Sequence, residues 1–144
     1  MIGDRFPAVV VHSLRDARAA LAPGRPVTLL SAEAAALYAG AGWWQALVAA
    51  ARAESPLTAV DDFLDCGDAS GHALAALRIG LRRLILRPDA PGRERVAAIV
   101  AAMDGTLLAE RPPALDLGDR ASLRRLHDWV QSRSGPDDSH AGLR

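Results

Sequence analysis

The 144-residue sequence contains no lysine and no asparagine, and all 17 of its basic residues are arginine. A Schiff-base mechanism needs a lysine amine, and the phosphate loop of P-loop nucleotide hydrolases needs a lysine as well. The sequence therefore excludes both chemistries. Its single cysteine, Cys66, excludes an internal disulfide and a metal site built from several thiolates.

Net charge and long apolar runs are also missing. The 17 acidic residues balance the 17 arginines, whereas nucleic-acid-binding domains and polybasic membrane anchors carry a basic surplus. No apolar run approaches the ~18 residues of a membrane span. The N-terminal stretch "MIGDRFPAVVV" lacks the basic start and the long apolar segment of a signal peptide. We therefore expect a cytoplasmic protein with no nucleic-acid partner and no membrane partner.

The apolar residues form five short runs, each followed by a segment with helical periodicity. The runs cover residues 8–11, 27–30, 63–66, 84–86 and 106–109. They are continuous rather than alternating, which is typical of strands buried on both faces of a parallel sheet. Alternating strands and helices imply right-handed crossovers. We predict an α/β fold: a small doubly wound, flavodoxin-like (βα)5 three-layer sandwich with a five-stranded parallel sheet.

Domain boundaries follow from composition. Residues 1–133 are expected to form a single α/β domain, and residues 134–144, which contain few apolar side chains, a disordered C-terminal tail. The stretch "RPPALDLG" at 111–118 is expected to be an extended connector that could hold a short edge strand. Asp61 and Asp62 are expected to begin the third strand as solvated charges.

Residues 64–88, "LDCGDASGHALAALRIGLRRLILRP", are similar to a strand–helix–strand unit of (βα)8-barrel enzymes such as the small keto-acid-phosphate aldolases. The resemblance covers about a sixth of the chain and implies the same local architecture. Those aldolases use a lysine, which this chain lacks, and five units do not close an eight-stranded barrel. No catalytic residue is therefore carried over from them.

Two adjacent tryptophans follow a glycine-broken turn at 40–42. Trp44 begins an i, i+3, i+4, i+7 apolar set, so the spacing predicts that it faces the sheet. Trp43 points ~100° away around the same helix, above small residues. Three roles stay open for Trp43: packing at the edge of the core, an oligomer contact or a ligand contact. Tyr38 could join it at the same surface.

The predicted site lies at the carboxyl ends of the strands, where ligands bind in open parallel sheets. Asp65 lies inside an apolar run, so its carboxylate must be hydrogen-bonded, paired or functional. It could accept hydrogen bonds from loop amides, pair with Arg87, or act as a general base together with His12. Cys66 is a candidate nucleophile or a small buried residue. We carry Asp65, His12 and Cys66 as candidate catalytic residues.

Other polar residues at this edge are candidate ligand-binding groups. With the two surface aromatics, these are Ser13, Ser31, Asp68, Arg87, Arg111, Trp43 and Tyr38. Ser13 and Ser31 are each also expected to cap a helix, and Asp68 or Ser70 to cap a third. A metal site from His12, Asp65 and Asp68 matches no ligand spacing that we recognise, so we expect no metal. The phosphate loops of flavodoxins and of dinucleotide-binding folds are absent, and we expect no cofactor.

Three functions fit these observations. The first is a binding or interaction module that self-associates or docks on a protein partner, with no complete catalytic set. The second is a small enzyme that uses the polar residues at the strand ends to act on a small anionic substrate. The third is a sensor that holds a small anionic ligand at the same edge without chemistry.

Overall fold

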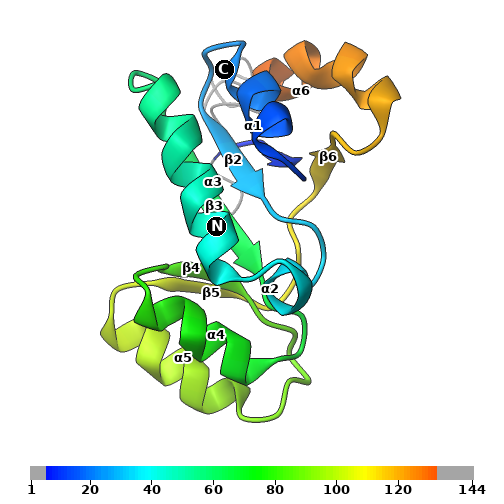
Figure 1. Cartoon of the computed structure of the whole chain (residues 1–144). Helices are drawn as coiled ribbons and strands as arrows, with labels where there is room; N and C mark the ends of the chain where they lie inside the picture. The colour runs from blue at the N-terminus through cyan, green and yellow to red at the C-terminus, as the bar shows by residue number, and fades with distance from the viewer. Residues whose placement is uncertain (1–5, 133–144) are drawn as a thin grey trace, which may run out of the picture.

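The computed structural model describes residues 6–132, which form a parallel sheet with helices connecting its strands (Figure 1). The strands are β1 Ala8–Val10, β2 Val27–Leu30, β3 Val60–Asp65, β4 Arg83–Ile85, β5 Thr106–Leu108 and β6 Ala114–Asp116. The α-helices are α1 Leu14–Leu21, α2 Ala35–Tyr38, α3 Ala41–Glu54, α4 Ser70–Arg78, α5 Arg93–Ala102 and α6 Leu126–Ser132. A 3-10 helix, η2 Arg120–Arg125, leads directly into α6. None of the helices in this part of the chain is long and apolar enough to cross a bilayer.

The α/β class with a parallel sheet flanked by helices is confirmed, but the sheet has six strands rather than five. The sixth strand, β6, lies in the expected connector and pairs in parallel with β1 at one edge of the sheet. It follows Pro112 and Pro113, which an edge position tolerates because a strand there needs partners on one side only. The domain boundary at 133 and the tail 134–144 lie outside the described residues.

The strand order is β5-β4-β3-β2-β1-β6. This differs from the flavodoxin-like order 2-1-3-4-5, in which the chain reverses direction after its first crossover. Here β1, β2, β3 and β4 each pair with the next strand in sequence, so the first four crossovers all move across the sheet in the same direction. Only the link from β5 to β6 returns to the starting side.

The sheet separates two apolar cores. Successive strand residues point to opposite faces, so Val9 of β1 joins the large core beneath the helices while Val10 joins a small core on the other face. The large core takes residues from all six α-helices. The small core takes one buried residue from each of β1 to β4, namely Val10, Leu30, Phe63 and Ile85, and Leu108 of β5 and Ala114 of β6 pack against them.

Residues 109–113 link the two edge strands directly (Figure 1). Six Cα-to-Cα steps reach at most about 21 Å, whereas five strand spacings in a flat sheet span about 24 Å. The sheet must therefore twist and curve to bring its edges closer. Arg111, at the centre of this segment, contacts Asp65 of β3 in the middle of the sheet. The segment thus crosses the face that carries the small core.

The helix boundaries correct two expected caps and confirm a third. Ser13 caps α1 as predicted, since its hydroxyl accepts a hydrogen bond from the Asp16 N–H. Ser31 caps no helix, because α2 begins four residues later and follows Ala34, whose φ is +56°. The residue before α4 is Ala69, so neither Asp68 nor Ser70 is its N-cap.

The acidic pair at the start of β3 is buried, which corrects the expectation of solvated charge. Asp61 and Asp62 are 8% and 7% exposed. Arg52 from α3 and Arg83 from β4 both donate to Asp62 Oδ1, at 2.8 and 3.2 Å. A buried carboxylate requires such partners, and these two come from residues 10 and 21 positions away in the sequence.

Candidate functional site

Asp65 is held by three hydrogen bonds at the carboxyl end of β3. Its Oδ1 accepts from the Gly67 N–H and its Oδ2 from Arg111 Nη1, both at 2.7 Å. Its own N–H donates to the Ser31 hydroxyl at 2.9 Å. The Asp65 side chain is 4% exposed and that of Arg111 27%. The predicted burial of a bonded carboxylate is correct, but its arginine partner is Arg111 rather than Arg87, which pairs with the exposed Asp89 at 3.1 Å.

These contacts give Asp65 a structural role. Both carboxylate oxygens are engaged, one by a turn amide and one by a guanidinium, so a substrate proton would have to compete with both. The ion pair holds residues 109–113, which we call the crossing segment, against the middle of the sheet. Ser31, a candidate ligand-binding residue, serves the same junction because it is fully buried and accepts the Asp65 N–H.

Cys66 is fully buried. Burial, together with the negative charge of Asp65, raises the pKa of the Cys66 thiol to about 12. The thiol therefore stays protonated at neutral pH, whereas a nucleophilic cysteine needs a lowered pKa and an accessible position. The geometry supports the small buried residue of the two alternatives.

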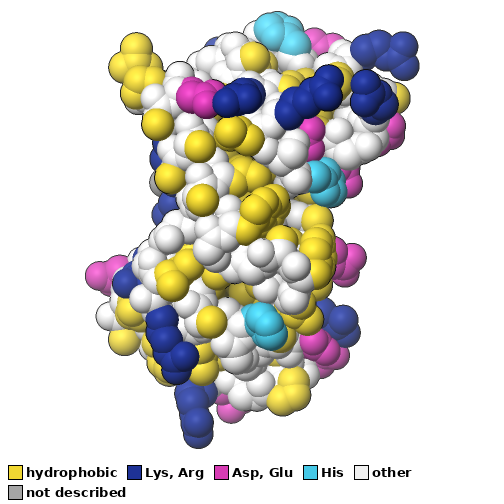
Figure 2. All heavy atoms as spheres, in the orientation of Figure 1, with side chains coloured by type: hydrophobic (Ala, Val, Ile, Leu, Met, Phe, Trp, Pro, Cys, Tyr) yellow, Lys and Arg dark blue, Asp and Glu magenta, His cyan; other side chains and the backbone are white. Residues whose placement is uncertain are grey.

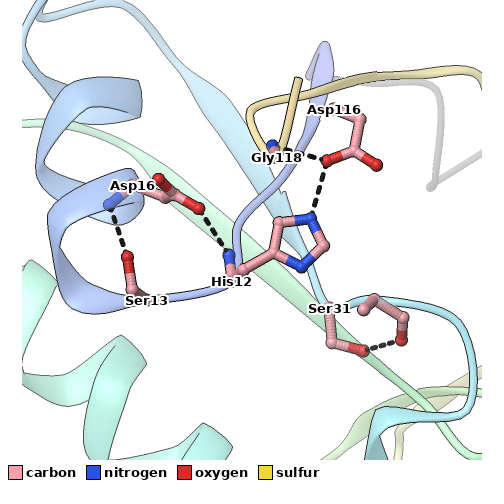
Figure 3. A network of polar contacts seen from close by, with 7 residues as sticks. His12, Ser13, Asp16, Ser31, Asp116 and Gly118 are labelled. Carbon is pink, nitrogen blue, oxygen red and sulfur yellow. Dashed lines mark hydrogen bonds and ion pairs between the residues drawn. The ribbon is translucent and has the colours of Figure 1, made fainter. Parts of the chain in front are cut away.

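His12 pairs with Asp116 on the neighbouring strand β6 (Figure 3). His12 Nε2 and Asp116 Oδ1 lie 2.7 Å apart, and the Gly118 N–H donates to the same oxygen at 2.8 Å. The His12 N–H is held from the other side by Asp16 at 2.8 Å. The sequence allowed a short edge strand within 111–118, as β6 proves to be, but did not single out Asp116 as a site residue. The alternation of apolar and acidic residues in "ALDLG" is the signal that could have found it.

The surroundings of Asp116 stabilise its ionised form. Partial burial opposes ionisation, but the hydrogen bonds from His12 and Gly118 and the positive charges of His12 and Arg111 outweigh it and lower the pKa of Asp116. The pair is tightly packed: a Cβ on Gly118 would lie 2.8 Å from His12 Nε2 and 3.0 Å from Asp116 Oδ1.

The strand ends therefore carry two separate pairs in place of the expected His12–Asp65 couple. No hydrogen bond joins His12 to Asp65 within residues 6–132. Asp68 is exposed. No group of three or more potential ligands in this part of the chain could hold a metal ion. The expected acid–base arrangement is thus not assembled by the described residues.

Two of the clefts that residues 6–132 form lie elsewhere on the molecule. One, of about 550 Å³, lies between the start of α4 and the start of α5 and is lined by Ser70, Pro88 and Arg93 among others. The other, of about 300 Å³, lies between α3 and the amino ends of β3 and β4. Neither His12 nor Asp65 lines either cleft.

The two tryptophans differ in burial as their helical spacing predicts. Trp44 is fully buried, with Leu47, Val48 and Ala51 on the same side of α3. Trp43 is 37% exposed, and its ring centroid lies 5.9 Å from that of Trp44. Tyr38, at the end of α2, is 70% exposed.

The outer side of α3 carries no charge over most of its length. Residues 41–51 contain no ionisable side chain, although several of them face solvent. The exposed positions are Gly42, Trp43, Ala46 and Ala49, followed one turn later by Ala53. We call these five residues the α3 outer face. In Figure 2, hydrophobic side chains follow α3 along this side of the molecule and continue toward α2.

Comparison with known protein families and with curated proteins finds no match for this chain. Its function is therefore inferred from the contacts and surfaces described above.

Proposed function

We propose that this protein is an interaction module that self-associates through the α3 outer face. The observation that carries the proposal is the absence of charge over residues 41–51 of α3, which are exposed on one side, whereas Arg52 and Glu54 follow only in its last turn. A surface helix of a globular protein normally places charged and polar residues opposite its apolar stripe. A helical stretch without charge on either side is normally buried on both, whereas only the inner side of residues 41–51 is buried within the chain.

Aromatic and aliphatic side chains extend this surface at the start of α3. Leu37, Tyr38 and Trp43 are 44%, 70% and 37% exposed. Tyrosine and tryptophan are enriched among residues that dominate binding energy, because they bury a large area with few rotatable bonds. An exposed apolar patch of this kind on a globular protein is typical of an interaction site.

A second copy of the same chain fits this surface. Gly42, Ala46, Ala49 and Ala53 recur at steps of three and four residues, so they form one line of small side chains along α3. Helices approach one another more closely where the contact residues are small. Two copies related by a two-fold axis would place this line against itself, with Trp43 at the margin. With a formal net charge of zero, two chains do not repel each other.

The polar residues at the strand ends favour this reading over an enzyme. Asp65 has both oxygens engaged, and the raised pKa of Cys66 keeps its thiol protonated. A small anionic ligand held by the polar residues at the carboxyl ends of the strands stays the alternative prediction. The cytoplasmic location expected from the sequence is part of this proposal.

Sedimentation velocity of the full chain and of two single variants tests the proposal. Ala46→Arg places a long charged side chain in the middle of the α3 outer face, where the monomer leaves room for it. Ala98→Arg is the matched control, because Ala98 is an exposed alanine in the middle of α5.

We expect the wild-type chain and Ala98→Arg to sediment as dimers at micromolar concentration, and Ala46→Arg as a monomer with unchanged circular dichroism. A wild-type chain that stays monomeric at every concentration would refute self-association. Equal dimerisation of the two variants would show that the α3 outer face is not the interface.

A further inference from the structure

The cleft between α3 and the amino ends of β3 and β4 has a volume of about 300 Å³. It lies at the other end of the strands from the site predicted from the sequence, which is at their carboxyl ends. Its wall combines apolar side chains, including Val48 and Leu81, with Arg52, Arg82 and Arg83. We propose that this cleft binds a small ligand that carries a phosphate group, held by the three arginines.

Positive charge exceeds negative charge among the residues that line this cleft. Three guanidinium groups share it with one carboxylate, that of Asp62. Asp62 accepts from Arg52 at 2.8 Å and from Arg83 at 3.2 Å, both on the same oxygen. One carboxylate neutralises one of these cations at most. About two positive charges are left without an anionic partner on the cleft wall.

The three arginines also have N–H donors that no described residue accepts from. A guanidinium has five N–H donors. Arg52 and Arg83 each use one on the Asp62 carboxylate and one on a backbone carbonyl of β3. Arg82 uses two on carbonyls at and just beyond the C-terminal end of α4. Three N–H donors on each guanidinium thus have no partner within residues 6–132.

These features match a phosphomonoester better than a carboxylate. A phosphomonoester carries a charge of about −1.5 to −2 at neutral pH and three terminal oxygens. Guanidinium groups bind phosphate oxygens through pairs of parallel N–H donors. Arg52 and Arg83 are 41% and 34% exposed, so their free donors can reach a ligand that enters from solvent. Val48 and Leu81 provide an apolar wall for the organic part of such a ligand.

Isothermal titration calorimetry with phenyl phosphate tests this proposal, with inorganic phosphate and succinate titrated at matched ionic strength. The wild-type chain should bind phenyl phosphate more tightly than inorganic phosphate, because only the former reaches the apolar wall. Arg82→Gln should weaken binding about tenfold or more, as expected for the loss of charge-assisted hydrogen bonds. Arg15→Gln, which removes an exposed arginine on α1, should change nothing.

Arg83→Lys is a second variant for the case that Arg82→Gln does not fold. It keeps the charge beside Asp62 but loses the paired donors, and it should also weaken binding. The proposal is overturned if phenyl phosphate does not bind, if Arg15→Gln weakens binding as much as Arg82→Gln, or if succinate binds as tightly as phenyl phosphate. Ala49 belongs both to the lining of this cleft and to the α3 outer face, so the titration is repeated on the wild-type chain at protein concentrations below those that give a dimer.

Discussion

Replacing Arg111 with methionine should destabilise the fold far more than replacing an exposed arginine. The substitution keeps most of the apolar stem but leaves the Asp65 carboxylate, 4% exposed, with only the Gly67 N–H. Breaking a buried ion pair by removing one partner costs about 3–5 kcal/mol. We expect a value near the lower end, about 3 kcal/mol, because Arg111 is 27% exposed and Asp65 keeps one hydrogen bond. For a domain of this size that corresponds to a fall in Tm of about 10 °C.

Urea unfolding at one fixed protein concentration measures this cost. Arg87→Met is the matched control, because the Arg87–Asp89 pair is exposed and should contribute less than about 1 kcal/mol. Arg111→Met combined with Asp65→Asn should be less destabilised than the sum of the two single variants, since no unpaired charge is then buried. If Arg111→Met unfolds at the same urea concentration as Arg87→Met, the crossing segment is not fastened by this pair.

Three further predictions concern the same edge of the sheet. Cys66 should resist iodoacetamide at mildly alkaline pH in the folded protein, because its pKa is about 12, and react readily in urea; mass spectrometry of the labelled chain measures this. Gly118→Ala should cost at most about 1 kcal/mol in urea unfolding, because the new Cβ meets the ends of two exposed side chains, His12 and Asp116, which can move apart at the loss of their pair. Gly71→Ala in α4, where a Cβ meets nothing within 4 Å, should stabilise by up to about 1 kcal/mol. Because the pKa of Asp116 is lowered, its contribution to stability is full above about pH 4 and is lost as pH falls through the folded-state pKa. Asp116→Asn should therefore flatten the acid side of a Tm profile, and an unchanged acid side would contradict this sign.

The spacing of apolar residues along the chain correctly predicted features that depend on which side of a strand or helix is buried. The continuous run at 27–30 is β2 with the same boundaries, because a strand buried on both faces needs apolar residues at every position. The helical spacing separated Trp44 from Trp43, because one full set of i, i+3, i+4, i+7 positions can face the sheet.

The ion-pair partners of the buried aspartates could not be predicted from the sequence, because they are distant from them along the chain. Asp62 was expected to be a solvated charge, whereas it is buried against Arg52 and Arg83, which lie 10 and 21 positions away in the sequence. Asp65 was expected to accept from loop amides or to pair with Arg87; it accepts from the Gly67 N–H, and its arginine partner is Arg111. Arg111 is 46 positions from Asp65 in the sequence and reaches it because the segment between β5 and β6 crosses the sheet at β3.

Strand order was the other feature that local patterns could not determine. The same alternation of strands and helices fits a chain that reverses after its first crossover and a chain that continues in one direction. The observed order depends on β1 pairing with β2 on one side and with β6 on the other. The strand β6 is three residues long and follows two prolines, so the sequence allowed a short edge strand there without showing which strand it would pair with.

Acrylamide quenching of tryptophan fluorescence across a range of protein concentrations tests the central claim most directly. Trp44 is buried within one chain and Trp129 is held there by a hydrogen bond to the Ala8 carbonyl, so concentration should alter only Trp43. If α3 forms the interface between copies, quenching should decrease as the protein is concentrated. Trp43→Phe should abolish that dependence. Quenching that stays constant over the whole range, in a chain that sediments as a dimer, would place the interface elsewhere and contradict the account.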